Sequence, residues 1–165
     1  MHRVCLAMFV CAGCASTAGG DTANARVFDA CSPLALDVST VSAGELANVT
    51  AAIASWTAVG VTAPVVAGGD APGVLAIAFE PSSPAFYGYY DGDTIFVSDD
   101  LASDAERDVV IAHELGHALG LAHVPATERG SVMNPGNLAL APTAADAAAI
   151  AARWGCARGD EHRAP

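Results

Sequence analysis

Three histidines and a glutamate lie within one short segment, His-Glu-Leu-Gly-His-Ala-Leu-Gly-Leu-Ala-His, at spacings that suit a metal ion. In a helix, residues four apart share a face, so His113 and His117 can aim ring nitrogens at one ion. A continued helix would carry His123 away from them, so the chain must turn, and Gly120 is where a left-handed conformation costs least. The spacing therefore predicts three imidazoles around one zinc ion, with a fourth position open.

Glu114 follows the first of these histidines and is rotated off their shared face. From there its carboxylate can reach a water on the zinc ion without binding the ion itself. Zinc lowers the pKa of such a water to about 7, so Glu114 would take its proton as general base and pass one to a leaving amine. The alternative, core and surface histidines with no common role, needs a chance match of order 10⁻⁵.

The helices that would position these residues begin with one signature, a Ser or Thr followed three residues later by an acid. They are predicted from Ser42 to about Val59, from Ser103 toward Leu119, and from Thr143 to a stop at Gly155. The acids are Glu45, Glu106 and Asp146.

Strand patterns lie mainly between the first two helices. Residues 73–80 are apolar on both faces, as in a strand covered on each side, and Thr94–Ser98 form a second strand. Residues 34–38 and 64–67 are weaker strand predictions. The order of elements predicts an α/β (α+β) fold with one mixed, twisted sheet and two helices, followed by a long loop and a C-terminal helix.

The histidine segment resembles the zinc motif of the metzincin metallopeptidases, His-Glu-x-x-His-x-x-Gly-x-x-His. Downstream, residues 131–135 (Ser-Val-Met-Asn-Pro) resemble the Met-turn of that group in its matrixin form. The resemblance covers about residues 34–156. It implies a metzincin-like fold, and it implies the following roles: zinc ligands His113, His117 and His123, general base Glu114, and Met133 as the apolar floor beneath the metal.

The chain also departs from that pattern. Val124 stands where matrixins usually have Ser, and Arg129 and Gly130 lengthen the loop before Met133. Asn134 stands where metzincins often have Tyr, so no tyrosine is available there to stabilise a transition state.

Two further sets of residues could take part in ligand binding, and each also has a structural interpretation. Asp91, Asp93, Asp99 and Asp100 could bind calcium, but their pattern favours ordinary turn aspartates. Three tyrosines could line the cleft or pack along a sheet edge, namely Tyr87, Tyr89 and Tyr90. An extended peptide substrate would pair with an edge strand, either residues 75–80 or a short strand after them, and residues 136–142 would wall a pocket.

The ends of the chain predict export. Residues 1–13 read as a signal peptide, with one arginine before an apolar run too short to span a bilayer. The ending Ala-Gly-Cys resembles the lipobox of bacterial lipoproteins, in which Cys14 would carry lipid; a plain secretory signal is the alternative. Residues 14–30 would be a tether, 31–156 the metallopeptidase catalytic domain, and 157–165 a flexible tail. The expected location is the bacterial outer membrane or the extracellular space.

Two cysteines remain in the mature domain, Cys31 and Cys156. In an oxidising compartment they would form a disulfide; two unpaired buried thiols are the alternative.

Charge limits the partners of the chain. Asp and Glu number 18 against 7 basic residues, all arginine, for a net charge of −11. Without a basic patch, nucleic acid is excluded as a partner. We expect a monomer that acts on proteins or peptides and meets a membrane only through its N-terminal lipid. The predicted function is a zinc-dependent endopeptidase; the alternative is an inactive zinc-holding lipoprotein that serves as a binding module.

Overall fold

The computed structural model describes residues 25–32, 34–61, 65–67, 74–81 and 86–155. Cys14, Cys156, residues 1–13 and the tail 157–165 lie outside these ranges. The described elements are β1 (Ala35–Asp37), α1 (Ala43–Ala58), β2 (Val65–Ala67), β3 (Leu75–Glu80), β4 (Gly88–Tyr90), β5 (Thr94–Ser98), α2 (Asp104–Ala118) and α3 (Ala144–Trp154).

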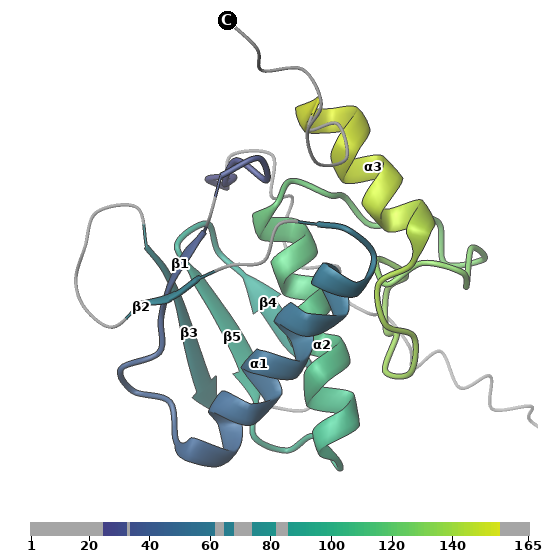
Figure 1. The fold of residues 1–165 in the computed structure, drawn as a ribbon. Helices are drawn as coiled ribbons and strands as arrows, with labels where there is room; N and C mark the ends of the chain where they lie inside the picture. Colours follow the sequence, from purple (N-terminus) through teal and green to yellow (C-terminus); the bar gives the residue numbers. More distant parts are fainter. Residues whose placement is uncertain (1–24, 33, 62–64, 68–73, 82–85, 156–165) are drawn as a thin grey trace, which may run out of the picture.

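The strands form one five-stranded mixed sheet in the order β2-β1-β3-β5-β4. β4 is the antiparallel member and ends the sheet beside β5, and the other pairs are parallel. In Figure 1, α1 and α2 lie side by side over one face of this sheet, while α3 lies apart from it. The α+β class, with one mixed sheet and two covering helices before a C-terminal helix, is therefore confirmed.

Burial alternates along the central strands. On β3, Leu75 and Ile77 are buried, whereas Ala76 and Ala78 between them are only partly covered. The prediction that this strand is covered on both faces is wrong, since small alanines rather than large side chains occupy its outer face. The helices bury one face of the sheet, and this makes a single core.

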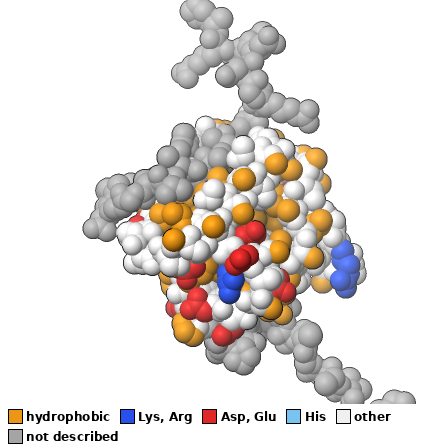
Figure 2. All heavy atoms as spheres, turned by 60° about the horizontal axis from the view of Figure 1, so that its bottom comes forward, with side chains coloured by type: hydrophobic (Ala, Val, Ile, Leu, Met, Phe, Trp, Pro, Cys, Tyr) orange, Lys and Arg blue, Asp and Glu red, His pale blue; other side chains and the backbone are white. Residues whose placement is uncertain are grey.

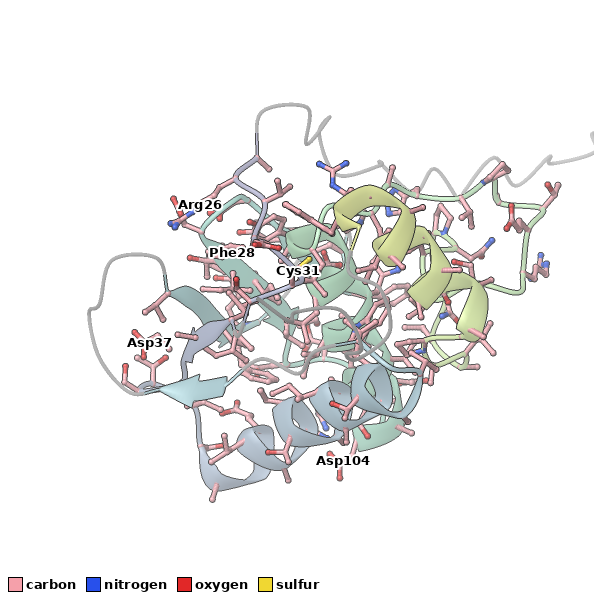
Figure 3. The ribbon with its side chains drawn as sticks, turned by 45° about the horizontal axis from the view of Figure 1, so that its top comes forward. Arg26, Phe28, Cys31, Asp37 and Asp104 are labelled. Carbon is pink, nitrogen blue, oxygen red and sulfur yellow. The ribbon has the colours of Figure 1, made fainter. Side chains whose placement is uncertain are left out.

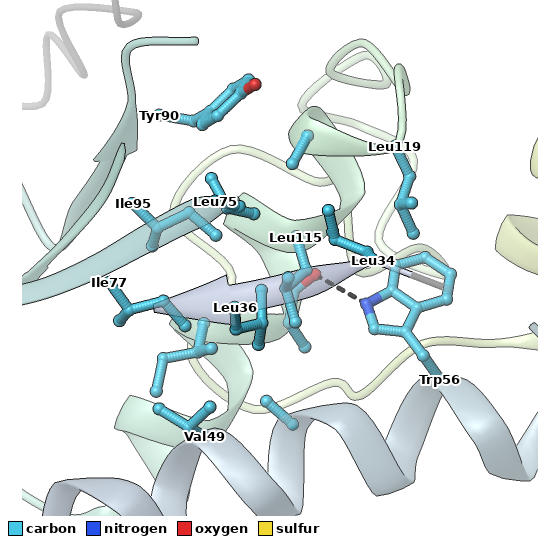
Figure 4. Close-up of a cluster of buried hydrophobic side chains, with 14 of the residues drawn as sticks. Leu34, Leu36, Val49, Trp56, Leu75, Ile77, Tyr90, Ile95, Leu115 and Leu119 are labelled. Atoms are coloured by element: carbon cyan, nitrogen blue, oxygen red, sulfur yellow. Dashed lines mark hydrogen bonds between the residues drawn. The ribbon is translucent and has the colours of Figure 1, made fainter. Parts of the chain in front are cut away.

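Trp56 joins the two covering helices inside that core. Its side chain is fully buried on α1, and its indole Nε1 donates to the carbonyl oxygen of Ala112 on α2 at 2.9 Å, the dashed line in Figure 4. A second polar contact between these helices is the bond from Asn48 Nδ2 to Asp108 Oδ1 at 2.8 Å. Together these contacts join α1 and α2 to each other.

All three predicted helix starts are confirmed, with Ser42, Ser103 and Thr143 as N-caps. Complete capping boxes are present at α1 and α3. At α2 the acid Glu106 instead accepts from the backbone N–H of Ala102, one residue before the cap.

The surface is consistent with the acidic composition. Figure 2 shows acidic side chains beside hydrophobic ones on the lower face, where basic side chains are sparse. No helix in the described part of the chain combines the length and the apolar character that crossing a bilayer requires.

Candidate metal centre

α2 presents the first two histidines, and the chain then turns as the spacing predicts. The helix ends at Ala118, and Gly120 takes a φ of 90°. The N–H of Gly120 donates to the carbonyl oxygen of His117 at 2.8 Å, and the N–H of Leu121 donates to that of Gly116 at 2.9 Å. These bonds reverse the chain and bring His123 back toward the helix.

The three rings converge on one point. Nε2 of His123 lies 3.1 Å from Nε2 of His113 and 3.1 Å from Nε2 of His117. A tetrahedral zinc ion with Zn–N bonds of about 2.0–2.1 Å separates its ligand nitrogens by about 3.3–3.4 Å. Among the described residues no other trio of metal-binding side chains comes together in this way. The donor set and its spacing fit zinc.

Backbone carbonyl groups hold two of the three rings through Nδ1, the ring nitrogen that faces away from the centre. Nδ1 of His113 lies 2.7 Å from the carbonyl oxygen of Val132, and Nδ1 of His117 lies 2.9 Å from that of Leu121. A ring that donates from Nδ1 keeps the lone pair on Nε2, which faces the centre. Nδ1 of His123 has no such partner among the described residues, and its side chain is exposed.

Burial keeps these rings neutral. It lowers the pKa of His113 to about 4, with a further contribution from the neighbouring His117. Burial lowers the pKa of His117 to about 4 as well, and shifts that of the more exposed His123 in the same direction. A neutral imidazole is the form that binds a metal ion, so the site is ready to do so at neutral pH.

Glu114 is buried next to the trio. Burial raises the pKa of its carboxyl group to about 8. The edge strand β4 passes close by, since a Cβ atom added to Gly88 would stand 2.6 Å from Cγ1 of Val110, 3.0 Å from the carbonyl oxygen of Phe96 and 3.2 Å from Cγ of Glu114. The glycine therefore lets the edge strand pack closely against α2 at Val110 and Glu114.

Met133 packs beneath the motif helix and is 1% exposed. A Cβ atom added to Gly116 would overlap its sulfur and would stand 3.3 Å from its Cε and from Cζ2 of Trp56. The glycine directly before His117 therefore gives the methionine its place against the helix.

Asp146 connects this region to α3. Its carboxylate accepts from Ser131 Oγ, from the N–H of Val132 at 3.2 Å, and from the N–H and Oγ1 of Thr143 at 2.8 and 2.7 Å. Burial alone would raise its pKa, but these donors outweigh burial and lower it. The capping-box pattern pointed to Asp146 as a helix-start residue, and nothing in the sequence pointed to this link toward the carbonyl that holds His113.

Of the two predicted substrate strands, residues 75–80 need a correction, because β3 lies between β1 and β5 and has no free edge. The other alternative, a short strand after them, is β4, which ends the sheet beside β5. Its Tyr89 stacks on Phe96 with ring centroids 4.6 Å apart, while the buried Tyr90 hydroxyl contacts the carbonyls of Arg26 and Gly92. Tyr87 is half exposed.

The remaining predicted site residues have ordinary contacts. Asp91 Oδ1 accepts from the N–H groups of Asp93 and Thr94, which is a turn contact, and calcium binding stays a prediction. Cys31 lies near the end of α3 in Figure 3, with Sγ 3.6 Å from the carbonyl oxygen of Trp154. The disulfide with Cys156 stays a prediction, because that partner is outside the described residues.

A mixed sheet under two helices, with a trio of converging imidazoles beside a buried glutamate, defines the class of zinc metallohydrolases. Within that class, a family model described as matrixin matches residues 62–150, more than half of the chain, and the chain belongs to this metallopeptidase family.

No curated protein matches the sequence. A similar solved structure is high choriolytic enzyme 1, a hatching-enzyme zinc protease from the medaka fish Oryzias latipes. It is 15% identical, with a TM-score of 0.49, over 76% of this chain and 90% of that one.

Proposed function

We propose that the chain is a zinc-dependent endopeptidase in which His113, His117 and His123 hold the ion and Glu114 is the general base. The observation that carries the proposal is the convergence of three Nε2 atoms beside a buried carboxylate. When bound, the ion would supply a Lewis acid that polarises a peptide carbonyl and acidifies water.

Glu114 moves the proton in this scheme. Its carboxylate oxygen accepts a proton from the attacking water and then donates it to the nitrogen of the departing amine. A carboxyl group with a pKa of about 8, instead of its ordinary 4.5, is matched to proton transfer near neutral pH. A cation nearby would favour its ionised form, in which it acts as a base.

β4 would hold the substrate. It pairs with β5 on one side and ends the sheet on the other, so its outer backbone groups can pair with an extended peptide. Because Gly88 of this strand packs against Glu114, a peptide added to the edge would pass beside the carboxylate. Residues 136–142 would wall the pocket next to the cleaved bond, and Met133 would form the floor.

Export accompanies this proposal. A lipid on Cys14 or a plain secretory signal would place the enzyme outside the cytoplasm. The short distance between Cys31 Sγ and the carbonyl of Trp154, two residues before Cys156, supports the disulfide expected there. Thiol titration with and without reductant distinguishes the disulfide from two free thiols.

The test is digestion of casein and of a peptide library by zinc-loaded protein, with and without a chelator. Glu114→Gln should retain zinc but lower kcat by about 10²–10⁴, because it removes the proton acceptor. Glu128→Gln, which makes the same change at an exposed glutamate on the loop after His123, should remain active.

The opposite results separate the alternatives. Activity that survives both the chelator and Glu114→Gln would rule out the assignment. A wild type that binds zinc but cleaves nothing would favour the zinc-holding binding module.

A further inference from the structure

We propose that Asn134 is a positioning residue for the third histidine: its side-chain amide fastens the loop after His123 and thereby sets where the ring of His123 stands. The inference rests on the proposed metal centre but not on peptidase activity.

His123 needs such support more than the other ligands do. His113 and His117 share the rigid α2, and a backbone carbonyl fixes each of their Nδ1 atoms. His123 follows the helix on an irregular segment, and within the described ranges no acceptor holds its Nδ1. Its ring can therefore be placed only through the backbone on either side.

Asn134 provides one tie to that backbone. Its Nδ2 lies 3.0 Å from the carbonyl oxygen of Glu128, 3.1 Å from that of Ala126 and 3.4 Å from that of Pro125. The side chain is only 8% exposed. Three acceptors around one atom fix the orientation of the amide, since the opposite orientation would turn an oxygen toward three carbonyls.

A backbone bond provides the second tie. The N–H of Val124, the residue after His123, donates to the carbonyl oxygen of Met133 at 3.2 Å. A turn closed by the N–H of Glu128 and the carbonyl of Pro125 at 2.8 Å shapes the loop between. Residues 124–128 are thus held against the consecutive residues 133 and 134, with His123 directly before them.

The chemistry of this contact requires an amide. A tyrosine hydroxyl has one hydrogen and cannot donate to several carbonyls at once, whereas the amide NH₂ has two. Removing the amide would leave the carbonyls of this exposed loop to water, and the loop would lose its side-chain tie to residue 134. These contacts therefore explain why this chain has Asn134 at the position where metzincins often have Tyr.

The experiment compares Asn134→Ala with Asn48→Ala. Asn48 is also a buried asparagine whose amide joins two segments, but it lies between α1 and α2, away from the trio. Zinc affinity is measured by competition with a chromophoric chelator, and the geometry of the site by the visible absorption of the Co²⁺-substituted protein. Thermal unfolding of the metal-free protein reports stability separately.

We expect Asn134→Ala to weaken zinc binding by about 10–100-fold and to change the Co²⁺ bands. Asn48→Ala should lower the unfolding temperature and leave both metal readouts as in wild type. Asn134→Ser keeps one donor and should give an intermediate affinity.

Equal zinc affinity and an equal Co²⁺ spectrum in Asn134→Ala and wild type would overturn the proposal. Loss of the fold in both Asn134 variants, while Asn48→Ala folds, would also overturn it in favour of a purely structural role. A folded wild type that binds no zinc would instead refute the metal centre itself, whereas zinc binding without proteolysis leaves this inference standing.

Discussion

His113 and His117 stand on a packed helix, whereas His123 stands on a segment without regular structure. The position of the helical pair comes from the i, i+4 spacing and from a helix fastened to the core through Trp56. The position of His123 depends on a turn at Gly120 and on a small number of loop hydrogen bonds. Helix packing therefore fixes the positions of two ligands, whereas local backbone contacts fix the position of the third.

The largest effect is expected on the helical side, at Gly116. Gly116→Ala should lower the free energy of unfolding by about 2–3 kcal/mol, because the added methyl group overlaps the Met133 sulfur and crowds Trp56. Gly44→Ala is the control, since its methyl group meets nothing within 4 Å, and it should add about 0.5–1 kcal/mol of stability. Urea unfolding measures both. A Gly116→Ala protein as stable as Gly44→Ala would contradict close packing under the motif.

The next effect is expected at Asp146, which holds the segment bearing the His113 acceptor. Asp146→Asn should lower the unfolding free energy of the metal-free protein by about 2 kcal/mol at pH 7, because one oxygen cannot accept all its present donors. Asp104→Asn, at an exposed carboxylate that forms an ion pair with Arg107, should change it by less than about 0.5 kcal/mol.

The pH dependence sharpens this test. The pKa of Asp146 is lower in the folded than in the unfolded protein, so a proton binds the unfolded chain more tightly. Its contribution is present above the ordinary carboxyl pKa of 3.8 and is lost as the pH falls through the folded value. The difference in unfolding free energy between wild type and Asp146→Asn should therefore become smaller at acidic pH. A difference that grows there would contradict the direction of the pKa shift.

The helical half of the comparison could be predicted from the sequence because local patterns determine it. Capping residues and apolar periodicity located α2 and α3 within a residue or two, and motif spacing identified the trio that the structure brings together. Local patterns could not give the strand order, because pairing of β3 with β5 depends on contacts far apart in the chain. For this reason the sequence leaves two candidates for the edge, residues 75–80 and a short strand after them, and only the second, β4, lies there.

For the segment that carries His123, the sequence predicts a turn and nothing more. Gly120 predicts that the chain reverses direction after α2, and its φ of 90° confirms this prediction. The carbonyls of Val132 and Leu121 that hold two rings are backbone atoms, and no residue type signals them. In the same way, Asn134 was visible as a departure from a pattern, but its three acceptors became visible only in the folded loop.

A smaller effect is expected at the turn itself, where two glycines allow a matched test. Gly60 and Gly120 follow α1 and α2 with φ of 89° and 90°. An alanine at either position should cost about 1 kcal/mol of unfolding free energy, because its Cβ disfavours this conformation. Gly120→Ala should cost about 0.5 kcal/mol more, because its methyl group also displaces the Arg153 side chain, whereas at Gly60 the space is open. Zinc affinity should fall in Gly120→Ala alone; an equal fall in Gly60→Ala would mean that the turn has no special role in placing His123.

The most local effect, confined to single amide groups, concerns which parts of the protein open more readily when zinc is removed. If helix packing positions the pair, chelation should leave exchange of the α2 amides, such as that of Leu115, nearly unchanged. The amide of Val124, bonded to the Met133 carbonyl next to His123, should exchange at least about tenfold faster, a local change of about 1.4 kcal/mol. Hydrogen exchange followed by NMR, with and without zinc, measures both sites in one sample. Equal acceleration at Leu115 and Val124 would show that the metal holds the helix as much as the loop, and the two kinds of ligand would then not differ in how they are positioned.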